Sequence, residues 1–178
     1  VRRQIEELIT RLAGIEGVIK HIPGHGRARS DSHETLPRVD ASATELASDS
    51  QPFADLCDAA MAMTAHVVYE AWDPHLCASV SPLIIEQQIR DRMGFEGLLM
   101  SDDLDMKALS GTLADRAAAV LHAGCDIALN CWGRLDDMEA IANRVTPMPE
   151  LSLSRLARAC AHVSATTDTP ALRQRIEA

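Results

Sequence analysis

Gly97-Leu-Leu-Met-Ser-Asp-Asp103 joins a short apolar strand to two adjacent acidic residues. Similar apolar runs occur at 17–20, 65–69 and 125–130, and segments with helical spacing of apolar residues separate them. Strands that alternate with helices form a parallel sheet with right-handed crossovers. The sequence therefore predicts an α/β fold.

Two architectures fit this alternation: a doubly wound open sheet, or part of a (β/α)₈ TIM barrel. An open sheet normally carries a glycine-rich phosphate loop, but Gly24-His-Gly26 lacks a third glycine and no helix follows it directly. A complete barrel needs about 250 residues, whereas this chain has 178 and four predicted strands. We therefore expect a partial barrel with parallel strands, equivalent to four β/α units.

The predicted helices lie before, between and after these strands. Ser81-Pro82 begins one that ends at Gly94, and Thr112 caps another that ends at Gly124. Apolar spacing places four more; these cover 5–12, 53–61, 135–145 and 154–164. We interpret 1–178 as a single domain, with a core at 15–145 and C-terminal helices at 150–178.

Composition limits the possible partners. The chain carries a formal charge of −9 and no basic stripe, which argues against nucleic-acid binding. No run reaches the roughly 18–20 apolar residues of a membrane span, and Val1-Arg-Arg3 opens an amphipathic segment rather than a signal peptide. The five cysteines contain no C-x-x-C pair and indicate small buried residues in a reducing compartment. We expect a cytoplasmic protein.

Polar residues follow the carboxyl ends of the predicted strands, which is the catalytic face of a parallel barrel. The first strand leads into Lys20 and His21, and the third leads into Asp102 and Asp103. In this pair, one carboxylate can point into the barrel mouth as a nucleophile while the other accepts backbone N–H groups. Alternatively, both are turn or cap residues, and spacing alone does not decide between these interpretations.

The loop after the first strand contains Asp31-Ser-His33. Asp31 can accept the ring N–H of His33 and fix its tautomer, or it can simply make its own backbone turn. A second possibility is a metal site on His21, His25, His33 and Asp102, although Pro23-Gly24 prevents helical alignment of the first two rings. We expect His66 and Trp72 to be packing residues, although an indole can also stack on a sugar.

Four segments in this order resemble glycoside hydrolase family 3, and within it the NagZ-type β-N-acetylglucosaminidases. They are Lys20-His-Ile-Pro-Gly-His-Gly26, Asp31-Ser-His33, Ala65-His-Val-Val-Tyr69 and Gly94-Phe-Glu-Gly-Leu-Leu-Met-Ser-Asp-Asp-Leu-Asp-Met106. The resemblance extends weakly through Ala123-Gly-Cys-Asp126. It implies the C-terminal half of a TIM barrel, without the family's first four strands.

The resemblance also implies an exo-acting retaining hydrolase that needs no metal or cofactor. It makes Asp102 the nucleophile and His33 the acid/base with Asp31 as its partner, while Lys20 and His21 bind sugar hydroxyls. The implied substrate is a carbohydrate, a muropeptide in which N-acetylglucosamine is linked to anhydro-N-acetylmuramic acid, and the implied setting is peptidoglycan recycling in the bacterial cytoplasm.

Two further expectations follow. The loop at 24–37, rich in glycine and serine, is predicted to close His33 over a bound sugar. Half a barrel leaves sheet edges and apolar surface exposed, so the segment alone is expected to self-associate or to be catalytically silent. Ile22 and Thr64 depart from the Phe and Pro usual in the family, and both changes are expected to be tolerated.

Overall fold

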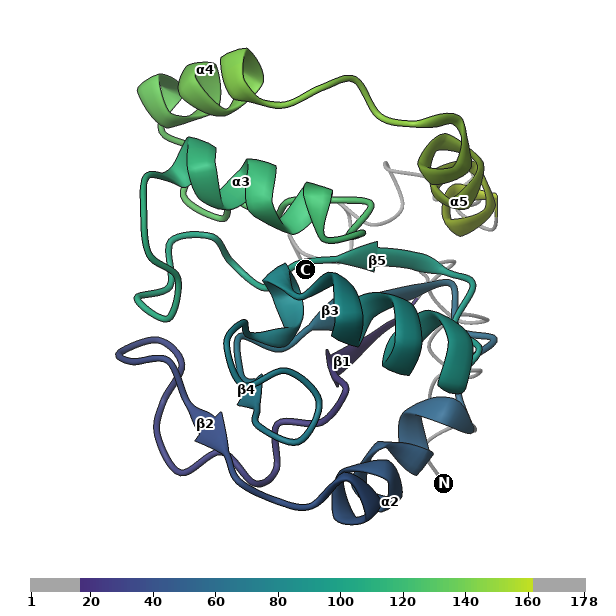
Figure 1. Ribbon diagram of the computed structural model, residues 1–178. Coiled ribbons are helices and arrows are strands. Elements are labelled where there is room, and N and C mark those ends of the chain that lie inside the picture. Colours follow the sequence, from purple (N-terminus) through teal and green to yellow (C-terminus); the bar gives the residue numbers. More distant parts are fainter. Residues whose placement is uncertain (1–16, 162–178) are drawn as a thin grey trace, which may run out of the picture.

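The computed structural model describes residues 17–161 as an α/β fold with parallel strands (Figure 1). In chain order its elements are β1 (Val18–Ile22), β2 (Arg38–Val39), α2 (Ala43–Ala54), β3 (Met61–Thr64), β4 (Val68–Tyr69), the short helix η1 (Ala78–Val80), the helix η2 (Ile84–Arg92), β5 (Leu98–Met100), α3 (Leu113–His122), α4 (Leu135–Arg144) and α5 (Glu150–Cys160). The predicted helix at 5–12 and the residues after 161 lie outside the described residues.

The main sheet has the strand order β1-β3-β5, and its strands are parallel. The three strands thus lie side by side in the order in which they occur along the chain, as in a TIM barrel, while β2 and β4 belong to another sheet. A second, two-stranded parallel sheet pairs β2 with β4. The partial-barrel prediction is confirmed in its fold class and in its strand direction.

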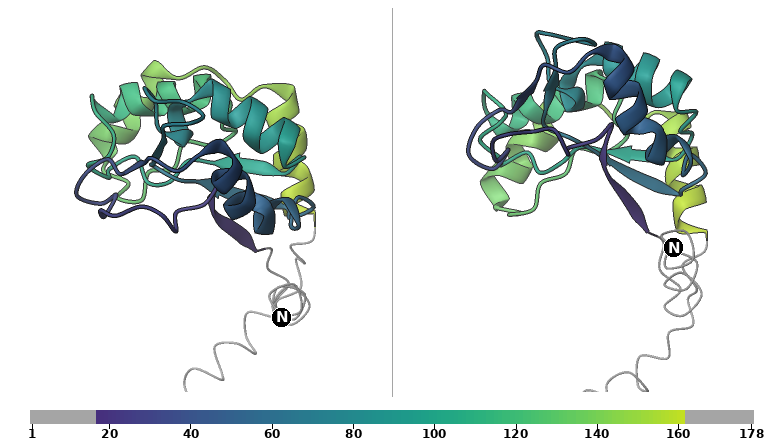
Figure 2. Two further views of the ribbon diagram at one scale, coloured as in Figure 1. Left: turned by 60° about the horizontal axis from the view of Figure 1, so that its bottom comes forward. Right: turned by 90° about the horizontal axis from the view of Figure 1, so that it is seen from below.

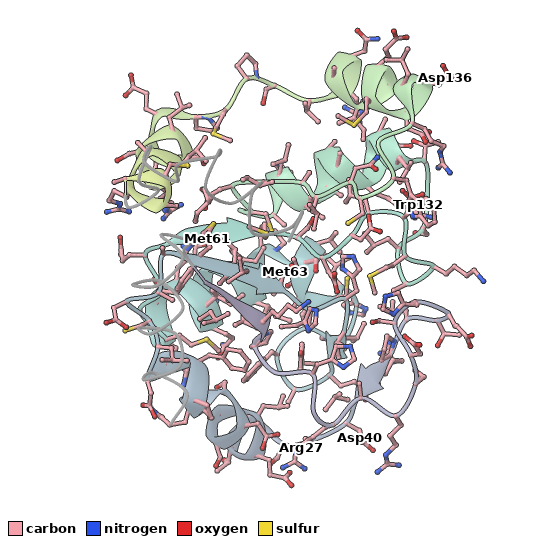
Figure 3. All side chains as sticks on the ribbon, turned by 180° about the vertical axis from the view of Figure 1, so that it is seen from behind. Arg27, Asp40, Met61, Met63, Trp132 and Asp136 are labelled. Carbon is pink, nitrogen blue, oxygen red and sulfur yellow. The ribbon has the colours of Figure 1, made fainter. Side chains whose placement is uncertain are left out.

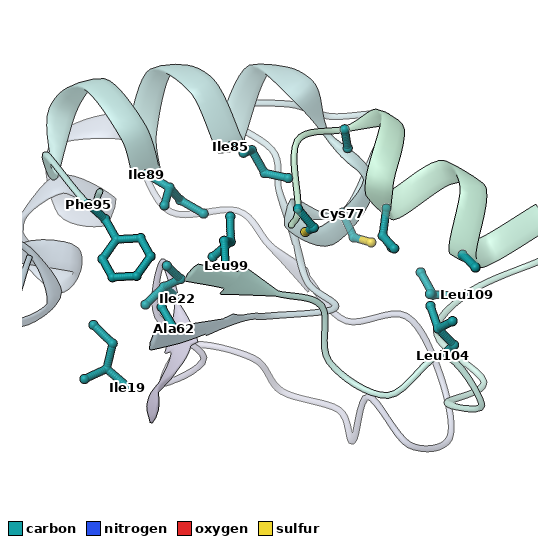
Figure 4. Packing of buried hydrophobic residues seen from close by; sticks show 14 of the residues in the cluster. Ile19, Ile22, Ala62, Cys77, Ile85, Ile89, Phe95, Leu99, Leu104 and Leu109 are labelled. Carbon is teal, nitrogen blue, oxygen red and sulfur yellow. The ribbon is translucent and has the colours of Figure 1, made fainter. Parts of the chain in front are cut away.

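Helices lie against one face of the main sheet (Figure 2). Ile85 and Ile89 of η2 pack with Leu99 of β5 and Ala62 of β3 in the larger apolar cluster of the described residues (Figure 4). Ile19 and Ile22 of β1, Phe95, and Ala117 and Val120 of α3 belong to the same cluster. Removal of this apolar surface from water is the main force that holds helices and sheet together.

The opposite face of the sheet carries alternate side chains of the same strands, because neighbouring residues of a strand point to opposite sides. Val18 is exposed, and Met61, Met63 and Met100 are half-buried. Figure 3 shows Met61 and Met63 on this face, seen from behind. The expected self-association would depend on this surface, and it stays a prediction.

The first and third predicted strands are confirmed as β1 and β5, but the second was misplaced. Strand β3 ends at Thr64, where residues 65–69 were expected to form the strand. Residues 65–69 are buried throughout, and only Val68–Tyr69 is a strand, paired with β2. Met61–Thr64 instead alternates between half-buried and buried positions, as a strand with two different faces does.

The predicted helix at 53–61 is wrong. Helix α2 begins after Ser42, whose hydroxyl accepts the N–H of Glu45 at 3.3 Å, while Glu45 accepts the N–H of Ser42 at 3.0 Å. This reciprocal capping box fixes the helix start. The apolar residues from Phe53 onward fall on the helix end, a turn and β3.

The other helices follow the prediction with two differences. The hydroxyl of Ser81 accepts the N–H of Ile84 at 3.2 Å, as expected of a cap, but the helix that follows is of the π type rather than α. Thr112 caps α3 as predicted, and α4 lies at the expected place. Helix α5 begins at Glu150, four residues earlier than predicted.

The predicted fourth strand at 125–130 is reduced to a single parallel bridge between Met100 and Ile127. The segment still runs beside β5, since Ser101 N–H donates to Ile127 O at 2.9 Å. The ladder is interrupted because the Asp126 carboxylate, rather than a backbone carbonyl, accepts the N–H of Leu99 at 2.9 Å. A carboxylate in a ladder position is not visible in an apolar pattern.

Gly97 lies where β5 begins, and a Cβ there would be 2.5 Å from Ala59 O and 2.8 Å from Ala60 O. Both contacts are with backbone, which cannot move as a flexible side chain does. We expect Gly97→Ala to lower the free energy of unfolding by about 1–3 kcal/mol. Urea denaturation measures this, with Gly26→Ala as the control, because a Cβ at Gly26 meets nothing within 4 Å. Equal stability of the two variants would contradict the prediction.

Candidate active site

Asp102 lies two residues after β5, where the acidic pair was expected. Its Oδ1 accepts the N–H of Asp103 at 2.9 Å, and its Oδ2 lies 3.5 Å from Nε2 of His21. The carboxylate is largely buried but retains some exposure, and His21 is half-buried. The structure therefore brings the ends of β1 and β5 together around one carboxylate oxygen.

His21 is poised to be neutral beside this carboxylate. Burial lowers the pKa of His21; Asp102 opposes this shift, whereas the positive charge of Lys20 reinforces it. A neutral imidazole leaves the Asp102 carboxylate without a full counter-charge and able to donate electrons. Lys20 itself is exposed in the middle of β1.

Asp103 points away from Asp102 and fastens two loops. Its Oδ1 accepts the N–H of Cys131 at 3.1 Å and the N–H of Asp105 at 3.3 Å. These are the backbone contacts expected for the second member of the acidic pair. Among the described residues, the geometry thus leaves Oδ2 of Asp102 without a backbone hydrogen bond, whereas Oδ1 of Asp103 accepts two backbone N–H groups.

His66 is a buried packing residue, as predicted, and both of its ring nitrogens have hydrogen-bond partners, one of them in the loop of Asp102 and Asp103. Its Nε2 donates to the carbonyl of Asp103 at 3.1 Å. Nδ1 is 2.7 Å from the hydroxyl of Ser79, which lies 2.7 Å from the hydroxyl of Thr64. Burial lowers the pKa of His66, so the ring is neutral and its one proton is on Nε2, facing the carbonyl of Asp103. Nδ1 is then an acceptor for the Ser79 hydroxyl, which also lies 3.1 Å from Ala65 O. Sequence reasoning missed this network.

Asp31 and His33 form the predicted pair. Asp31 Oδ1 accepts both the backbone N–H of His33 at 2.9 Å and its ring Nδ1–H at 2.8 Å. These two hydrogen bonds hold the pKa of Asp31 below its usual value. The His33 side chain is 75% exposed, which leaves Nε2 free to meet a ligand. The two alternatives for Asp31, a turn and a partner for the ring, are both realised.

The loop that carries this pair is attached to the fold at several points. The hydroxyl of Tyr69 donates to Gly24 O at 2.9 Å, and Nε2 of His25 lies 3.3 Å from the hydroxyl of Ser32. Arg27 pairs with Asp49 of α2. The exposed segment that carries Asp31 and His33 therefore lies between fixed points.

The metal hypothesis gains no ligand set. Within residues 17–161, no three His, Cys, Asp or Glu side chains gather as a metal-binding group. The rings of His21 and His25 meet edge to face with centroids 5.8 Å apart, and His33 pairs with Asp31.

No helix within the described residues 17–161 is long and apolar enough to cross a membrane.

The cysteines correspond only in part to the prediction. All five are free; Cys77 and Cys125 are buried, Cys57 is half-buried, and Cys131 and Cys160 are exposed. Burial raises the pKa of Cys77 to about 11 and that of Cys125 to about 12, so both are inert thiols.

Sequence reasoning also missed the loop 130–134, which follows the reduced fourth strand. It contains Trp132, whereas we considered only Trp72 as an indole that could meet a sugar. Trp72 is half-buried, and its ring centroid lies 5.5 Å from that of Tyr69, so it is a packing residue. The position of Trp132 after a predicted strand was a usable signal, because polar and aromatic residues there reach the catalytic face.

Comparison with known proteins gives a consistent result. Residues 3–165 match the family profile described as Glycosyl hydrolase family 3 N terminal domain. A beta-hexosaminidase of Thioalkalivibrio sulfidiphilus is 41% identical over 151 residues, which cover 82% of this chain and 43% of that protein. A beta-hexosaminidase of Alkalilimnicola ehrlichii is 44% identical over 126 residues, with 68% and 36% covered. The chain thus spans less than half the length of these relatives.

Solved structures agree. NagZ from Neisseria gonorrhoeae, in complex with N-trifluoroacetyl-D-glucosamine, superimposes with a TM-score of 0.73 at 32% identity and covers 93% of this chain and 47% of its own. CbsA from Thermotoga neapolitana gives a TM-score of 0.76 at 29% identity, with 89% and 39% covered. The similarity in structure therefore extends over most of this chain and over less than half of each solved structure.

Proposed function

The chain belongs to glycosyl hydrolase family 3, and from this premise we propose that it carries the catalytic residues of an exo-acting, retaining β-N-acetylglucosaminidase. The observation that carries the proposal is that the loops after β5 and β1 supply a carboxylate, Asp102, and an imidazole, His33, and that both lie close enough to His21 to shift its pKa. Asp102 presents a largely buried carboxylate oxygen, Oδ2, that has no backbone partner among the described residues. His33 presents Nε2, while its other ring nitrogen, Nδ1, donates to Asp31. A nucleophile and a proton donor are the two groups that retaining hydrolysis needs.

In the first step, Oδ2 of Asp102 attacks the anomeric carbon, and the bond from this carbon to the leaving oxygen breaks. Nε2–H of His33 gives its proton to that oxygen, while Asp31 accepts Nδ1–H and stabilises the imidazolium. In the second step, neutral His33 takes a proton from water, which attacks the glycosyl ester and releases Asp102 as a carboxylate. Each group returns to its starting state.

The N-acetylglucosamine that forms the ester with Asp102 is proposed to lie over β1. His21 lies beside Asp102 and Lys20 is the exposed residue before it in β1, and both side chains can donate hydrogen bonds to sugar hydroxyls. This assignment follows from the family resemblance, and the short distance between His21 and Asp102 supports it. The closing motion of the loop at 24–37 stays a prediction.

The role of His33 gives the test of the proposal. We expect His33→Ala to lower kcat/KM for N-acetylglucosaminyl disaccharides by about 10²–10⁴-fold, the usual contribution of a general acid. The loss should be smaller for 4-nitrophenyl N-acetylglucosaminide, because nitrophenolate leaves without a proton. The variant should also lose the part of its pH–rate profile that depends on the acid.

His122→Ala is the matched control, since His122 is an exposed histidine on α3. It should keep the activity and the pH profile of the parent chain. An equal loss for both substrates in His33→Ala would contradict general-acid catalysis. A parent chain that binds the disaccharide but cleaves neither substrate would refute hydrolysis by this chain on its own and would match the expectation of a catalytically silent segment.

We further propose the narrower substrate that the resemblance implies. This is a muropeptide that ends in N-acetylglucosamine linked to anhydro-N-acetylmuramic acid, released in the bacterial cytoplasm during cell-wall recycling. The bacterial beta-hexosaminidases among the relatives support the class of sugar. Comparison of kcat/KM for this disaccharide and for N,N′-diacetylchitobiose tests the preference, and a higher value for chitobiose would reject it.

A further inference from the structure

We propose that Trp132 is a stacking platform for the leaving-group sugar, the ring on the far side of the bond that is cleaved. The inference rests on the proposed glycosidase function and adds to it a residue that determines specificity. It would select leaving groups that present a flat pyranose face, and it would favour a disaccharide over a substrate without a second ring.

Exposure is the first observation. Trp132 is 71% exposed, although an indole is among the side chains that gain most from burial. Trp72, the other tryptophan, is packed against Tyr69. An exposed indole offers a large, rigid, apolar face, which is the surface that the C–H face of a sugar ring contacts.

The second observation is that the loop under Trp132 is fixed. Oδ1 of Asn130 accepts the N–H of Trp132 at 3.1 Å and that of Gly133 at 3.2 Å. Arg134 donates to Asp105 at 3.1 Å and is paired with Asp137 of α4. These hydrogen bonds hold the backbone of Trp132 in place, so stacking would need little additional ordering of the loop.

The third observation is position. Cys131 donates its N–H to Asp103, the neighbour of Asp102, at 3.1 Å. Trp132 is therefore one residue from a direct contact with the acidic loop. Its segment bridges β5 on the side away from β3 and β1. The carboxylate of Asp102 thus has His21 of β1 on one flank, and the loop of Trp132 follows the segment on the other side of β5.

These positions assign the two sugar rings to two flanks. If the strand-β1 flank holds the N-acetylglucosamine that is released, the next ring must leave from another flank, and the rigid indole lies there. Figure 3 shows Trp132 on the loop at the edge of the molecule, away from Met61 and Met63 of the uncovered sheet face. Exposure of Trp132 is thus separate from exposure of that face.

Kinetics of the chain with two substrates test the proposal. Trp132→Ala should raise KM for N,N′-diacetylchitobiose by about five- to tenfold with little change in kcat, as expected for the loss of one aromatic contact. The same variant should leave kcat/KM for β-N-acetylglucosaminyl azide unchanged, because azide has no ring to stack. Trp132→Phe should restore most of the disaccharide KM.

Leu135→Ala is the matched control. Leu135 is also 71% exposed and lies three residues further on, at the start of α4, but no described hydrogen bond joins its backbone to the acidic loop. It should leave both substrates unaffected. Equal effects of the two variants would overturn the proposal and indicate a general apolar surface, such as a protein interface.

Fluorescence gives an independent readout. In a Trp72→Phe, Asp102→Asn variant, Trp132 is the only tryptophan, because the chain has two, and hydrolysis is blocked. Chitobiose should protect Trp132 from acrylamide quenching, and N-acetylglucosamine alone should not. If neither sugar protects Trp132 in this variant although the parent chain cleaves chitobiose, the stacking role of Trp132 is overturned and the glycosidase function is not. No cleavage of either substrate would overturn the glycosidase function, and the platform with it.

Discussion

Asp102→Asn is expected to lower kcat/KM for N-acetylglucosaminides by at least about a thousandfold, since an amide cannot act as the nucleophile. Asparagine has nearly the same shape and keeps an oxygen for the N–H of Asp103, now 2.9 Å from Oδ1. The loss would therefore come from chemistry and not from unfolding. The measurement is steady-state hydrolysis of 4-nitrophenyl N-acetylglucosaminide.

Asp103→Asn is the matched control for this substitution. Its Oδ1 would still accept the N–H groups of Cys131 and Asp105, so we expect a loss of less than about tenfold. A fluorinated N-acetylglucosaminide should label the parent chain, and mass spectrometry should place the sugar on Asp102. A label on Asp103, or a larger loss in Asp103→Asn, would reverse the assignment. A chain that binds sugar without being labelled would be a catalytically silent segment.

Asp126→Ala is expected to lower the free energy of unfolding by about 3–5 kcal/mol, the cost of leaving buried charges unpaired. The Asp126 side chain is 2% exposed. It pairs with Arg90 of η2 at 2.9 Å and with Arg155 of α5 at 3.0 Å, and it accepts the hydroxyl of Ser152 at 2.6 Å. Its loss would leave both guanidinium groups without their counter-charge and would remove the hydrogen bonds by which Ser152 and Arg155 of α5 are held to this carboxylate.

Urea denaturation followed by circular dichroism measures this effect. Glu70→Ala is the control, because Glu70 pairs with Arg38 at the surface and such pairs contribute about 0–1 kcal/mol. Asp126→Asn should fall between the two, since asparagine keeps an acceptor for Leu99 N–H but loses the charge. Similar midpoints for Asp126→Ala and Glu70→Ala would contradict a central role for this cluster.

The elements that could be predicted from the sequence were those with strong local signals. Ser81 and Thr112 begin helices at the expected places, and the apolar runs of β1 and β5 were found. The misplaced strand at 65–69 is buried on all sides, and burial of this kind depends on partners distant in sequence. The start of α2 was missed although Ser42 and Glu45 carry a local capping signal.

The candidate site divides in the same way. The pairing of Asp31 with His33 could be predicted because the two residues are close in sequence. The distinction between Asp102 and Asp103 required the fold, since it depends on His21 from β1 and on Cys131 from the loop before α4. The support from His66 also could not be foreseen, because its partners are 13 and 37 residues away.

The hydrogen bonds from Asp103 to Asp105 and Cys131 have a consequence for redesign of this chain. They join the loop after β5 to the loop of Trp132, and Leu104 N–H adds a bond to Leu129 O at 2.9 Å. The loop 130–134, which would select the leaving group, is therefore rigidly connected to the loop that positions the attacking carboxylate of Asp102. Lengthening the loop 130–134 to admit a new leaving group would also move Asp102. The same mutations would therefore widen the range of substrates and lower kcat.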